Sequence, residues 1–207
     1  MPFAILLCNI LLKRIAIMST DSKKVKLFIV AMAPSQQKPE SFVLVLEEET
    51  RKKKLPILVG RSEAFAIGIA LEALKMKRPM THDLLLSSIL ALNGLPKYIL
   101  IKDKVDGIFH SDIVIEPKDD VTTYIDSRTS DAIAFAIRAK IPMYINSKLL
   151  NAEHSGEKIF LEGNRRSSFA AYTLEELEIL LEKVLRKEDY QSAARIKETI
   201  EKKKKTL

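Results

Sequence analysis

The sequence is poor in residues that form covalent or metal-bound cross-links. Its 207 residues include one cysteine and three histidines. The single cysteine, Cys8, excludes an internal disulfide, and without a cluster of cysteine and histidine there is no zinc site of the usual kind. We therefore expect a reducing, cytoplasmic setting.

The sequence also lacks an apolar run of membrane-spanning length. At the amino end, "MPFAILLCNILLKRIAIM" has about ten apolar residues before Lys13 and Arg14. A membrane span needs about 20 apolar residues, and a secretory signal places its positive charge before the run. An interfacial anchor is an alternative, because the two basic residues could lie at lipid headgroups. We expect residues 1–24 to be an irregular extension without stable membrane insertion.

The middle of the chain has no excess of charge of either sign. The formal net charge of +7 lies in residues 1–26 and 164–207, whereas residues 27–163 hold eighteen basic and eighteen acidic residues. The basic total therefore says little about what the middle of the chain binds. Its acidic residues would repel phosphate unless a metal ion or nearby arginines intervened.

Between residues 25 and 150, short apolar runs alternate with turn residues and helical patterns. Runs rich in β-branched and aliphatic residues predict strands, and apolar residues at helical spacing predict helices. The expected strands are 25–32, 41–48, 54–60, 97–103, 108–116, 122–126 and 142–146, and the expected helices are 61–76, 130–140 and one from Thr81 to a C-cap at Asn93-Gly94. The first three strands suggest a meander, and residues 104–107 predict a hairpin turn. This order predicts an α+β fold, a mixed β-sheet with packed helices.

The composition changes after residue 150. Residues 151–172 have few periodic apolar positions, which is typical of a linker. From Thr173 two apolar stripes at helical spacing predict an antiparallel helical hairpin over 173–207. Alone this hairpin buries too little apolar surface to be very stable, so we expect it to dock against a partner or a second copy of the chain.

Two of the expected helices open with the same kind of polar triplet, Ser62-Glu63-Ala64 and Ser130-Asp131-Ala132. Ser62 and Ser130 are good N-caps, and an acid in the first turn suits the positive end of the helix dipole, so capping explains most of the pattern. The alternative is that the two helix starts hold acids at one site.

The neighbouring residues favour a shared site. Arg128 stands between Asp126 and Asp131, and "RPMTHD" places Arg78, His82 and Asp83 around another helix start. The four carboxylates of Glu63, Asp83, Asp126 and Asp131 are candidate ligands for Mg²⁺ or Mn²⁺, which can activate water and neutralise a phosphodiester. Arg78, Arg128 and Ser130 are candidate phosphate contacts, and His82 is a candidate acid or base. His82 is equally suited to a backbone hydrogen bond in the first helical turn.

At these residues the sequence resembles the bifunctional nuclease domain family. The resemblance rests on "LPILVGRSEAFAI", "RPMTHDLLLSSI", "VDGIFHSDIVI" and "IDSRTSDAIAFAIRAKIPMYI", and covers residues 25–150. It implies a compact α+β domain, commonly oligomeric, with nuclease activity on RNA and DNA as substrates. The residues that match the family pattern are Glu63, Ala64, Arg78, Pro79, Thr81, His82, Asp83, Asp126, Arg128, Ser130, Asp131 and Ala132.

Two positions depart from that pattern. His110 stands where the family usually has an aromatic residue, and we interpret it, like His154, as local variation and not as a ligand. Thr129 replaces a usual proline, which loosens the turn before Ser130.

The carboxyl end resembles the UVR motif of bacterial excision-repair proteins, a helical hairpin used for protein contact. The match rests on "DYQSAARIKETI", although Lys197-Glu198 stands where the motif usually has Arg-Asp. The resemblance implies a protein partner for residues 173–204.

Two functional classes follow from the sequence. The first is a metal-assisted nuclease for RNA and DNA with a protein-interaction hairpin. The second is a non-catalytic oligomeric regulator or adaptor in which the acids at the helix starts are caps. Family resemblance and the charged helix starts favour the nuclease, whereas the neutral domain favours the regulator.

Overall fold

A computed structural model of the chain describes residues 23–35, 38, 40–74, 76–117, 121–153, 172–185 and 190–206. Most of the expected N-terminal extension and linker, with His154, lies outside the described residues. The strands are β1 (Lys24–Pro34), β2 (Ser41–Glu48), β3 (Lys54–Gly60), β4 (Gly94–Val105), β5 (Ile108–Pro117), β6 (Thr123–Arg128) and β7 (Met143–Asn146). The helices are α2 (Arg61–Leu71), α3 (Thr81–Ala91), α4 (Thr129–Ala139), α5 (Ser147–Glu153), α6 (Leu174–Leu185) and α7 (Tyr190–Thr206).

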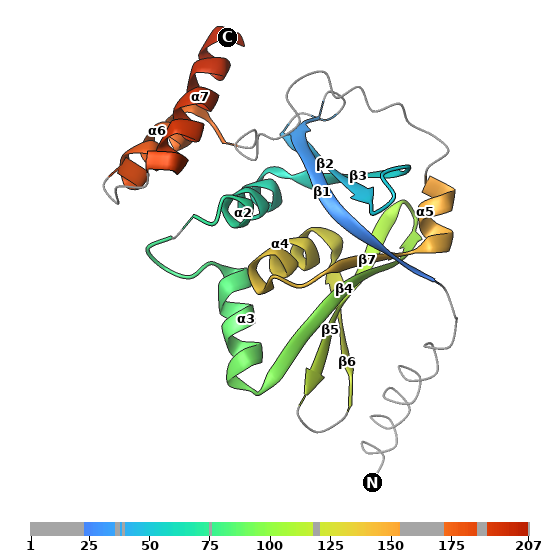
Figure 1. Ribbon diagram of the computed structural model, residues 1–207. Helices are drawn as coiled ribbons and strands as arrows, with labels where there is room; N and C mark the ends of the chain where they lie inside the picture. The colour runs from blue at the N-terminus through green and yellow to red at the C-terminus, as the bar shows by residue number, and fades with distance from the viewer. Residues whose placement is uncertain are drawn as a thin grey trace.

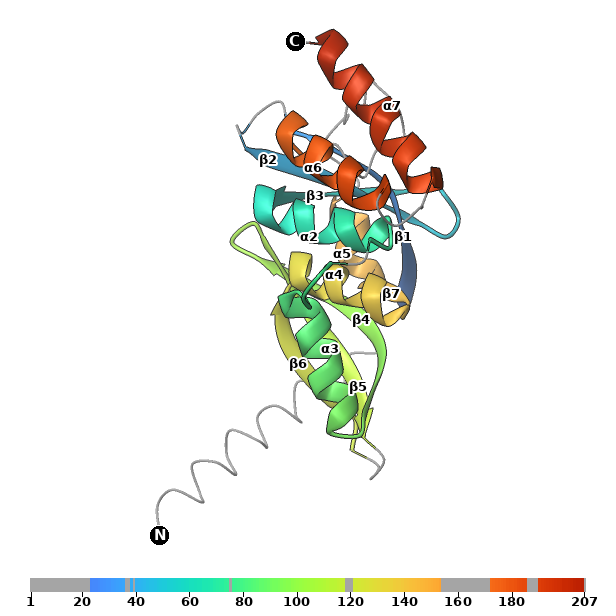
Figure 2. The same cartoon turned by 90° about the vertical axis from the view of Figure 1, so that its left-hand side faces the viewer.

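The seven strands form one mixed sheet in the order β3-β2-β1-β7-β4-β5-β6. The expected meander β1-β2-β3 and the β4–β5 hairpin are both antiparallel, as the sequence predicts. The last strand, β7, is inserted between β1 and β4 and runs parallel to β4, which makes the sheet mixed. Helices α2, α3 and α4 lie together on one face of the sheet (Figures 1 and 2). The predicted α+β fold is confirmed.

The core lies between the sheet and these helices. Its strand residues alternate with residues of the other face, as in β2, where Phe42, Leu44 and Leu46 are buried. Helix α4 contributes an almost continuous buried run from Ala132 to Ala136. The two prolines in strand interiors occupy tolerated positions: Pro56 lies in the edge strand β3, and Pro96 lies at an irregularity of β4.

Helix α2 ends five residues earlier than its apolar pattern predicts. Ala73 adopts a left-handed conformation with φ 52°, and the amide of Leu74 donates to the carbonyl of Ile69 at 3.0 Å. This arrangement closes the helix without a glycine. At the end of α3 the left-handed residue is Asn93, with φ 59°, while Gly94 already belongs to β4. The short helix α5 was not expected, because seven residues are too few to show a helical period.

The C-terminal helices α6 and α7 pack against each other, and α6 lies on the side of α2 (Figure 2). The ring of Tyr172, which is 2% exposed, lies 4.7 Å from the ring of Phe65 in α2. Arg61 at the start of α2 pairs with Glu176, and Glu72 at its end pairs with Arg195. The predicted hairpin therefore docks, but on its own chain.

The apolar stripes of the hairpin are continuous with the core of the sheet domain. Leu177, Val184 and Ile196 are buried in the same cluster as residues of β1 and α4. None of the described helices is both long and apolar enough to cross a membrane.

Candidate functional site

Three helices begin with an acid at the same position. Glu63 in α2, Asp83 in α3 and Asp131 in α4 are each the third residue of their helix, three positions after an N-cap residue of extended conformation. At this position a carboxylate can reach back to the N-cap amide, as in a capping box. In α3 it does so, because the amide of Met80 donates to Oδ2 of Asp83 at 2.8 Å.

The serine caps expected from the sequence were wrong. The N-cap residues of α2, α3 and α4 are Gly60, Met80 and Arg128, so Ser62, Thr81 and Ser130 lie inside the first turn. Neither α2 nor α4 has a side-chain hydrogen bond to its cap. The acids of these two helices therefore have another role.

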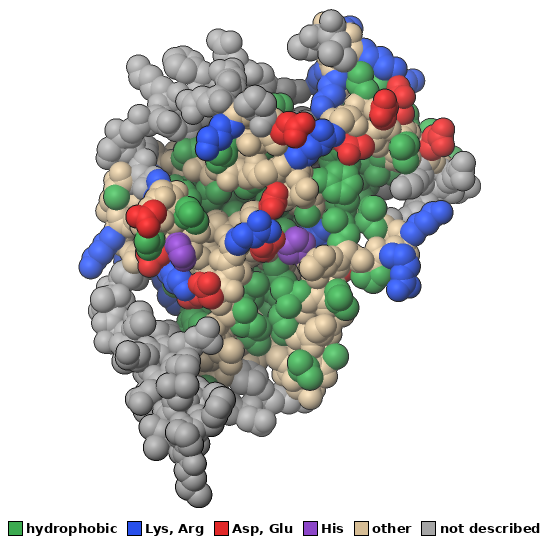
Figure 3. All heavy atoms as spheres, turned by 180° about the vertical axis from the view of Figure 1, so that it is seen from behind, with side chains coloured by type: hydrophobic (Ala, Val, Ile, Leu, Met, Phe, Trp, Pro, Cys, Tyr) green, Lys and Arg blue, Asp and Glu red, His purple; other side chains and the backbone are tan. Residues whose placement is uncertain are grey.

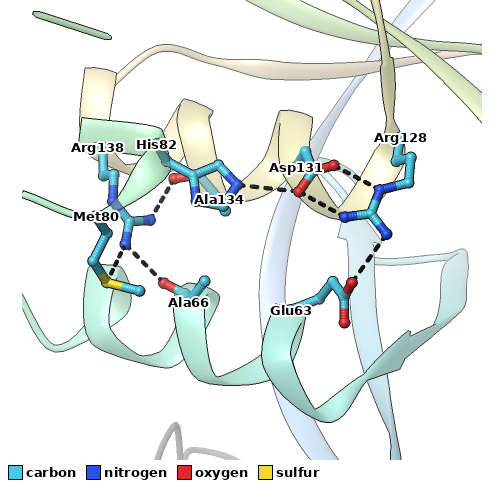
Figure 4. Close-up of polar contacts among 8 residues, drawn as sticks. All are labelled: Glu63, Ala66, Met80, His82, Arg128, Asp131, Ala134 and Arg138. Atoms are coloured by element: carbon cyan, nitrogen blue, oxygen red, sulfur yellow. Dashed lines mark hydrogen bonds and ion pairs between the residues drawn. The ribbon is translucent and has the colours of Figure 1, made fainter. Parts of the chain in front are cut away.

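Arg128 joins the acids of α2 and α4 (Figure 4). Its Nε and Nη2 atoms donate to the two carboxylate oxygens of Asp131 at 2.8 and 3.3 Å, and its Nη1 atom donates to Oε1 of Glu63 at 3.0 Å. The hydrogen bonds and charge of Asp131, followed by those of Glu63, raise the pKa of Arg128. The side chain is nevertheless 69% exposed, so the guanidinium is both anchored and open to solvent.

His82 completes this cluster from the first turn of α3. Its Nε2 atom lies 3.2 Å from Oδ1 of Asp131, and the imidazole is 13% exposed. Its Nδ1 atom is buried without a hydrogen-bond partner among the described residues. We call Glu63, His82, Arg128 and Asp131 the helix-start cluster. It brings together α2, α3 and α4, as Figure 4 shows.

Asp83 belongs to a separate, structural contact. Its Oδ1 atom accepts a 2.8 Å hydrogen bond from Nε of Arg138, whose side chain is only 7% exposed. Arg138 also donates to the carbonyls of Ala66 in α2 and Ala134 in α4 (Figure 4). This buried arginine therefore ties three helices together. Asp83 and Ala66 lie far from it in the sequence, and the only signal for it is one charge in the apolar run "AIAFAIRA".

Asp126 lies in a third place. Lys102 of β4 bridges it to Asp112 of β5, with Nζ to Oδ1 distances of 2.8 and 2.7 Å. Burial lowers the pKa of Lys102, but the hydrogen bonds and charges of Asp112 and Asp126 outweigh this effect, and the net shift is upward. Lys102 and Arg128 thus each bridge two carboxylates, at different sites.

The four acids that the sequence groups as metal ligands are therefore divided among three sites. Within the described ranges, no group of three or more histidine, cysteine, aspartate or glutamate side chains is placed to hold a metal ion. In the helix-start cluster, the carboxylate oxygens of Glu63 and Asp131 already accept hydrogen bonds from Arg128. The arrangement does not fit a resident Mg²⁺ or Mn²⁺ ion while Arg128 bridges the two carboxylates.

The remaining residues singled out from the sequence lie outside the helix-start cluster as defined above. Arg78 is exposed in the loop between α2 and α3 and makes no ion pair among the described residues. Ser130 is half-buried in the first turn of α4. His110, interpreted from the sequence as local variation, lies directly opposite Arg128 in the register of β5 and β6.

The middle of the chain matches a known protein family. Residues 44–157, more than half of the chain, match the family model described as "Bifunctional nuclease domain", and the hairpin lies beyond the matched part. Two relatives, both named as uncharacterized proteins of Mycobacterium tuberculosis, come from strains CDC 1551 / Oshkosh and ATCC 25618 / H37Rv. Each is 35% identical over 108 residues, which is 52% of this chain and 63% of the relative. The chain belongs to the bifunctional nuclease domain family.

Proposed function

We propose that the protein is a nuclease that hydrolyses phosphodiester bonds of RNA and DNA at the helix-start cluster. The observation that carries the proposal is Arg128, an exposed guanidinium held in place by Glu63 and Asp131 in a member of this family. Its hydrogen bonds to Asp131 and Glu63 use three of the five N–H donors of a guanidinium. The remaining donors suit the oxygens of a phosphodiester.

A site that acts on both nucleic acids needs water as the nucleophile, because DNA has no 2′-hydroxyl. Hydrolysis forms a bond between the water oxygen and phosphorus and breaks the bond to the leaving oxygen, while one water proton must be taken up and the leaving oxygen must gain one. Asp131 and Glu63 are the candidate bases, with side-chain exposures of 32% and 22%. His82 holds Asp131 in position through Nε2.

Dependence on Mg²⁺ or Mn²⁺ is a separate part of the proposal. A divalent cation would contact Glu63 or Asp131 in competition with Arg128, so we derive no catalytic step through it. Cleavage measured in Mg²⁺, in Mn²⁺ and in a chelator tests this point directly.

The nuclease proposal is tested by comparing the cleavage rates of one arginine variant and one lysine variant with that of the wild type. Arg128→Ala removes a charge-assisted phosphate contact, which costs about 1.5 to 3 kcal/mol and should slow cleavage of single-stranded RNA and DNA roughly tenfold to a hundredfold. Lys102→Ala is the matched control, because Lys102 also bridges two carboxylates but lies outside the cluster. Equal cleavage by all three proteins would count against the site, and no cleavage by the wild type would count against the nuclease.

A second candidate is a non-catalytic oligomeric regulator or adaptor. It is favoured by the capping role of Asp83 and by the pairing of Asp126 with Lys102, since these acids have structural partners. In either case we propose that residues 173–204 contact a protein partner, through exposed apolar residues of the hairpin such as Ile179 and Tyr190.

A further inference from the structure

One end of the sheet carries basic residues from two separate parts of the sequence. Strand β1 begins with "KVK" after Lys23, and the turn between β2 and β3 contains "RKKK", residues 51–54. Strands β1 and β2 are antiparallel neighbours, and the amide of Glu49 donates to the carbonyl of Lys26 at 3.2 Å. The turn therefore lies beside the start of β1. We call Lys23, Lys24, Lys26 and residues 51–54 the basic end.

Helix α5 joins the two parts of the basic end. The amide of Ser147 at the start of α5 donates to the carbonyl of Lys23 at 2.9 Å. Nζ of Lys53 donates to Oδ1 of Asn151 in the same helix. Figure 1 shows α5 beside the start of β1. Strand pairing and one helix thus hold these basic residues together at one place.

The basic end has more basic than acidic residues. Its seven cations lie beside three acids, Glu47, Glu48 and Glu49. Glu48 is 8% exposed, and Glu47 is paired with Lys54 at 3.9 Å. Figure 3 shows a different distribution on the rear face of the molecule, where acidic and basic side chains lie side by side around the histidines. The middle of the chain is neutral in sum, but its cations at residues 51–54 join those at the start of β1.

Three cations of the basic end have no acidic partner. Lys23, Arg51 and Lys52 are exposed and make no ion pair among the residues that the structure describes. Their charge is not cancelled by a neighbouring carboxylate, so it is available to attract a polyanion. The phosphate backbone of a nucleic acid is such a polyanion, and its binding to lysine and arginine releases counterions.

Aromatic side chains lie among these lysines. Lys24, Lys26 and Phe28 alternate with the buried Leu27, so they lie on the face of the sheet opposite to the helical layer. Nζ of Lys26 is 5.1 Å from the ring centroid of Phe28, which is 44% exposed. Nζ of Lys24 is 4.3 Å from the ring centroid of Tyr98. Lysines beside an exposed aromatic ring suit a single strand, because its bases are free to stack on the ring.

We propose that the basic end binds the backbone of a single-stranded nucleic acid and that Phe28 stacks on one of its bases. The inference rests on the proposed function, because it makes this surface an anchor for a strand that is cleaved at the helix-start cluster. Strand β3 runs from Lys54 of the basic end to Gly60 at the start of α2, a distance of about 20 Å. At about 3.4 Å per nucleotide, the spacing in a duplex strand, about six nucleotides cover this distance.

The electrostatic part is tested by fluorescence anisotropy with a labelled single strand of about 20 nucleotides. The full-length protein is used in a chelator, and a gel checks that the probe stays intact. Lys23→Gln, Arg51→Asn and Lys52→Gln are combined, with asparagine at residue 51 because its φ is 59°. The Kd should rise at least roughly tenfold, and the slope of log affinity against log salt should become shallower by about 0.7 for each lost phosphate contact.

A control variant removes the same charge elsewhere. Lys202→Gln, Lys204→Gln and Lys205→Gln, combined at exposed positions of α7, should leave the Kd of the single strand nearly unchanged. The stacking part is tested by Phe28→Leu, at an exposed position. This variant should bind the single strand roughly tenfold more weakly with the same salt slope, and should bind a duplex of equal length as the wild type does.

Three results would overturn the proposal. The first is a wild-type chain that does not bind the single strand at low salt. The second is equal binding by the wild type and the triple variant of the basic end. The third is binding to vesicles of anionic phospholipid that the single strand does not displace and that the triple variant loses. A chain that binds the strand through the basic end but does not cleave it would contradict the proposed function alone.

Discussion

Arg128 and Glu63 stand 65 residues apart in the sequence and are joined by an ion pair of 3.0 Å between Nη1 and Oε1. The pair connects the residue at the start of α4 to the third residue of α2. It explains why two helices of this chain open with similar polar triplets. The acids at these starts do not cap their own helices but hold one arginine between them.

Gly60 provides space for the Glu63 carboxylate, and its replacement tests that placement. A Cβ atom at residue 60 would lie 2.5 Å from Oε2 of Glu63, whereas the backbone angles of Gly60, φ −71° and ψ 168°, suit any residue. Gly60→Ala should therefore keep the melting temperature but move the carboxylate of Glu63. Its cleavage rate should fall below that of the wild type, as the rate of Glu63→Gln should. If Gly60→Ala cleaves at the wild-type rate while Glu63→Gln cleaves slowly, the space at residue 60 does not position the Glu63 carboxylate.

Arg138 should matter for stability far more than Arg128. Arg138→Met keeps the apolar stem but leaves Oδ1 of Asp83 without its donor and removes the hydrogen bond to the carbonyl of Ala66. Hydrogen bonds to a charged group are worth about 1.5 to 3 kcal/mol, so we expect a loss of this size. Arg128→Met removes exposed ion pairs, which are worth about 0 to 1 kcal/mol. Urea unfolding of both variants checks the contrast. Equal losses of unfolding free energy would contradict the structural role of Arg138.

The hairpin should stabilise the sheet domain without being required for its folding. Ending the chain after residue 153 uncovers Phe65 but leaves the core between the sheet and α4 intact, so the shortened chain should still melt cooperatively at a lower temperature. Tyr172→Ala in the full chain should cost about 3 to 5 kcal/mol, as for other buried aromatic residues. A shortened chain that melts without cooperativity would mean that the two parts fold as one unit.

The cap of α6 should weaken in acid. Burial opposes the charge of Glu176, but hydrogen bonding to the amide and the side chain of Thr173 and the pairing with Arg61 outweigh it and hold the pKa below its ordinary value of 4.5. Because the folded pKa is the lower one, this carboxylate stabilises the fold above pH 4.5, and the contribution is lost as the pH falls through the folded pKa. The unfolding free energies of wild type and Glu176→Gln should therefore differ at pH 7 and converge in acid. If the difference between the two unfolding free energies grows as the pH falls, the pKa of Glu176 is not lowered in the folded state and the prediction is wrong.

The sequence predicts the elements of this fold well because their apolar periods are clear. All seven strands and the helices α2, α3 and α4 occur at the places within residues 25–150 that the sequence predicts, with ends that differ by a few residues. The place of β7 between β1 and β4 could not be predicted, since strand order depends on long-range pairing that no local pattern encodes. The early end of α2 depends on a left-handed Ala73, a residue with no special preference for that conformation.

The candidate site was predicted in part. Glu63, His82, Arg128 and Asp131 do meet, because three helix starts come together on one side of the sheet. Asp126 and Asp83 are near them in sequence but have their own cations, Lys102 and Arg138. Charges that are close in sequence cannot show which partner each will find. Arg138 was missed because its partner Asp83 is 55 residues away.

The most direct test of the proposed function is the rate at which Asp131→Asn cleaves single-stranded RNA and DNA. Asparagine has the same size but cannot take a proton from water or pair with Arg128 as a charge. We predict that cleavage falls roughly a hundredfold or more, about 2.7 kcal/mol in activation free energy. The melting temperature should change by only about 2 to 4 °C, because the lost ion pairs are exposed. Wild-type cleavage by Asp131→Asn at an unchanged melting temperature would contradict a catalytic role for the helix-start cluster.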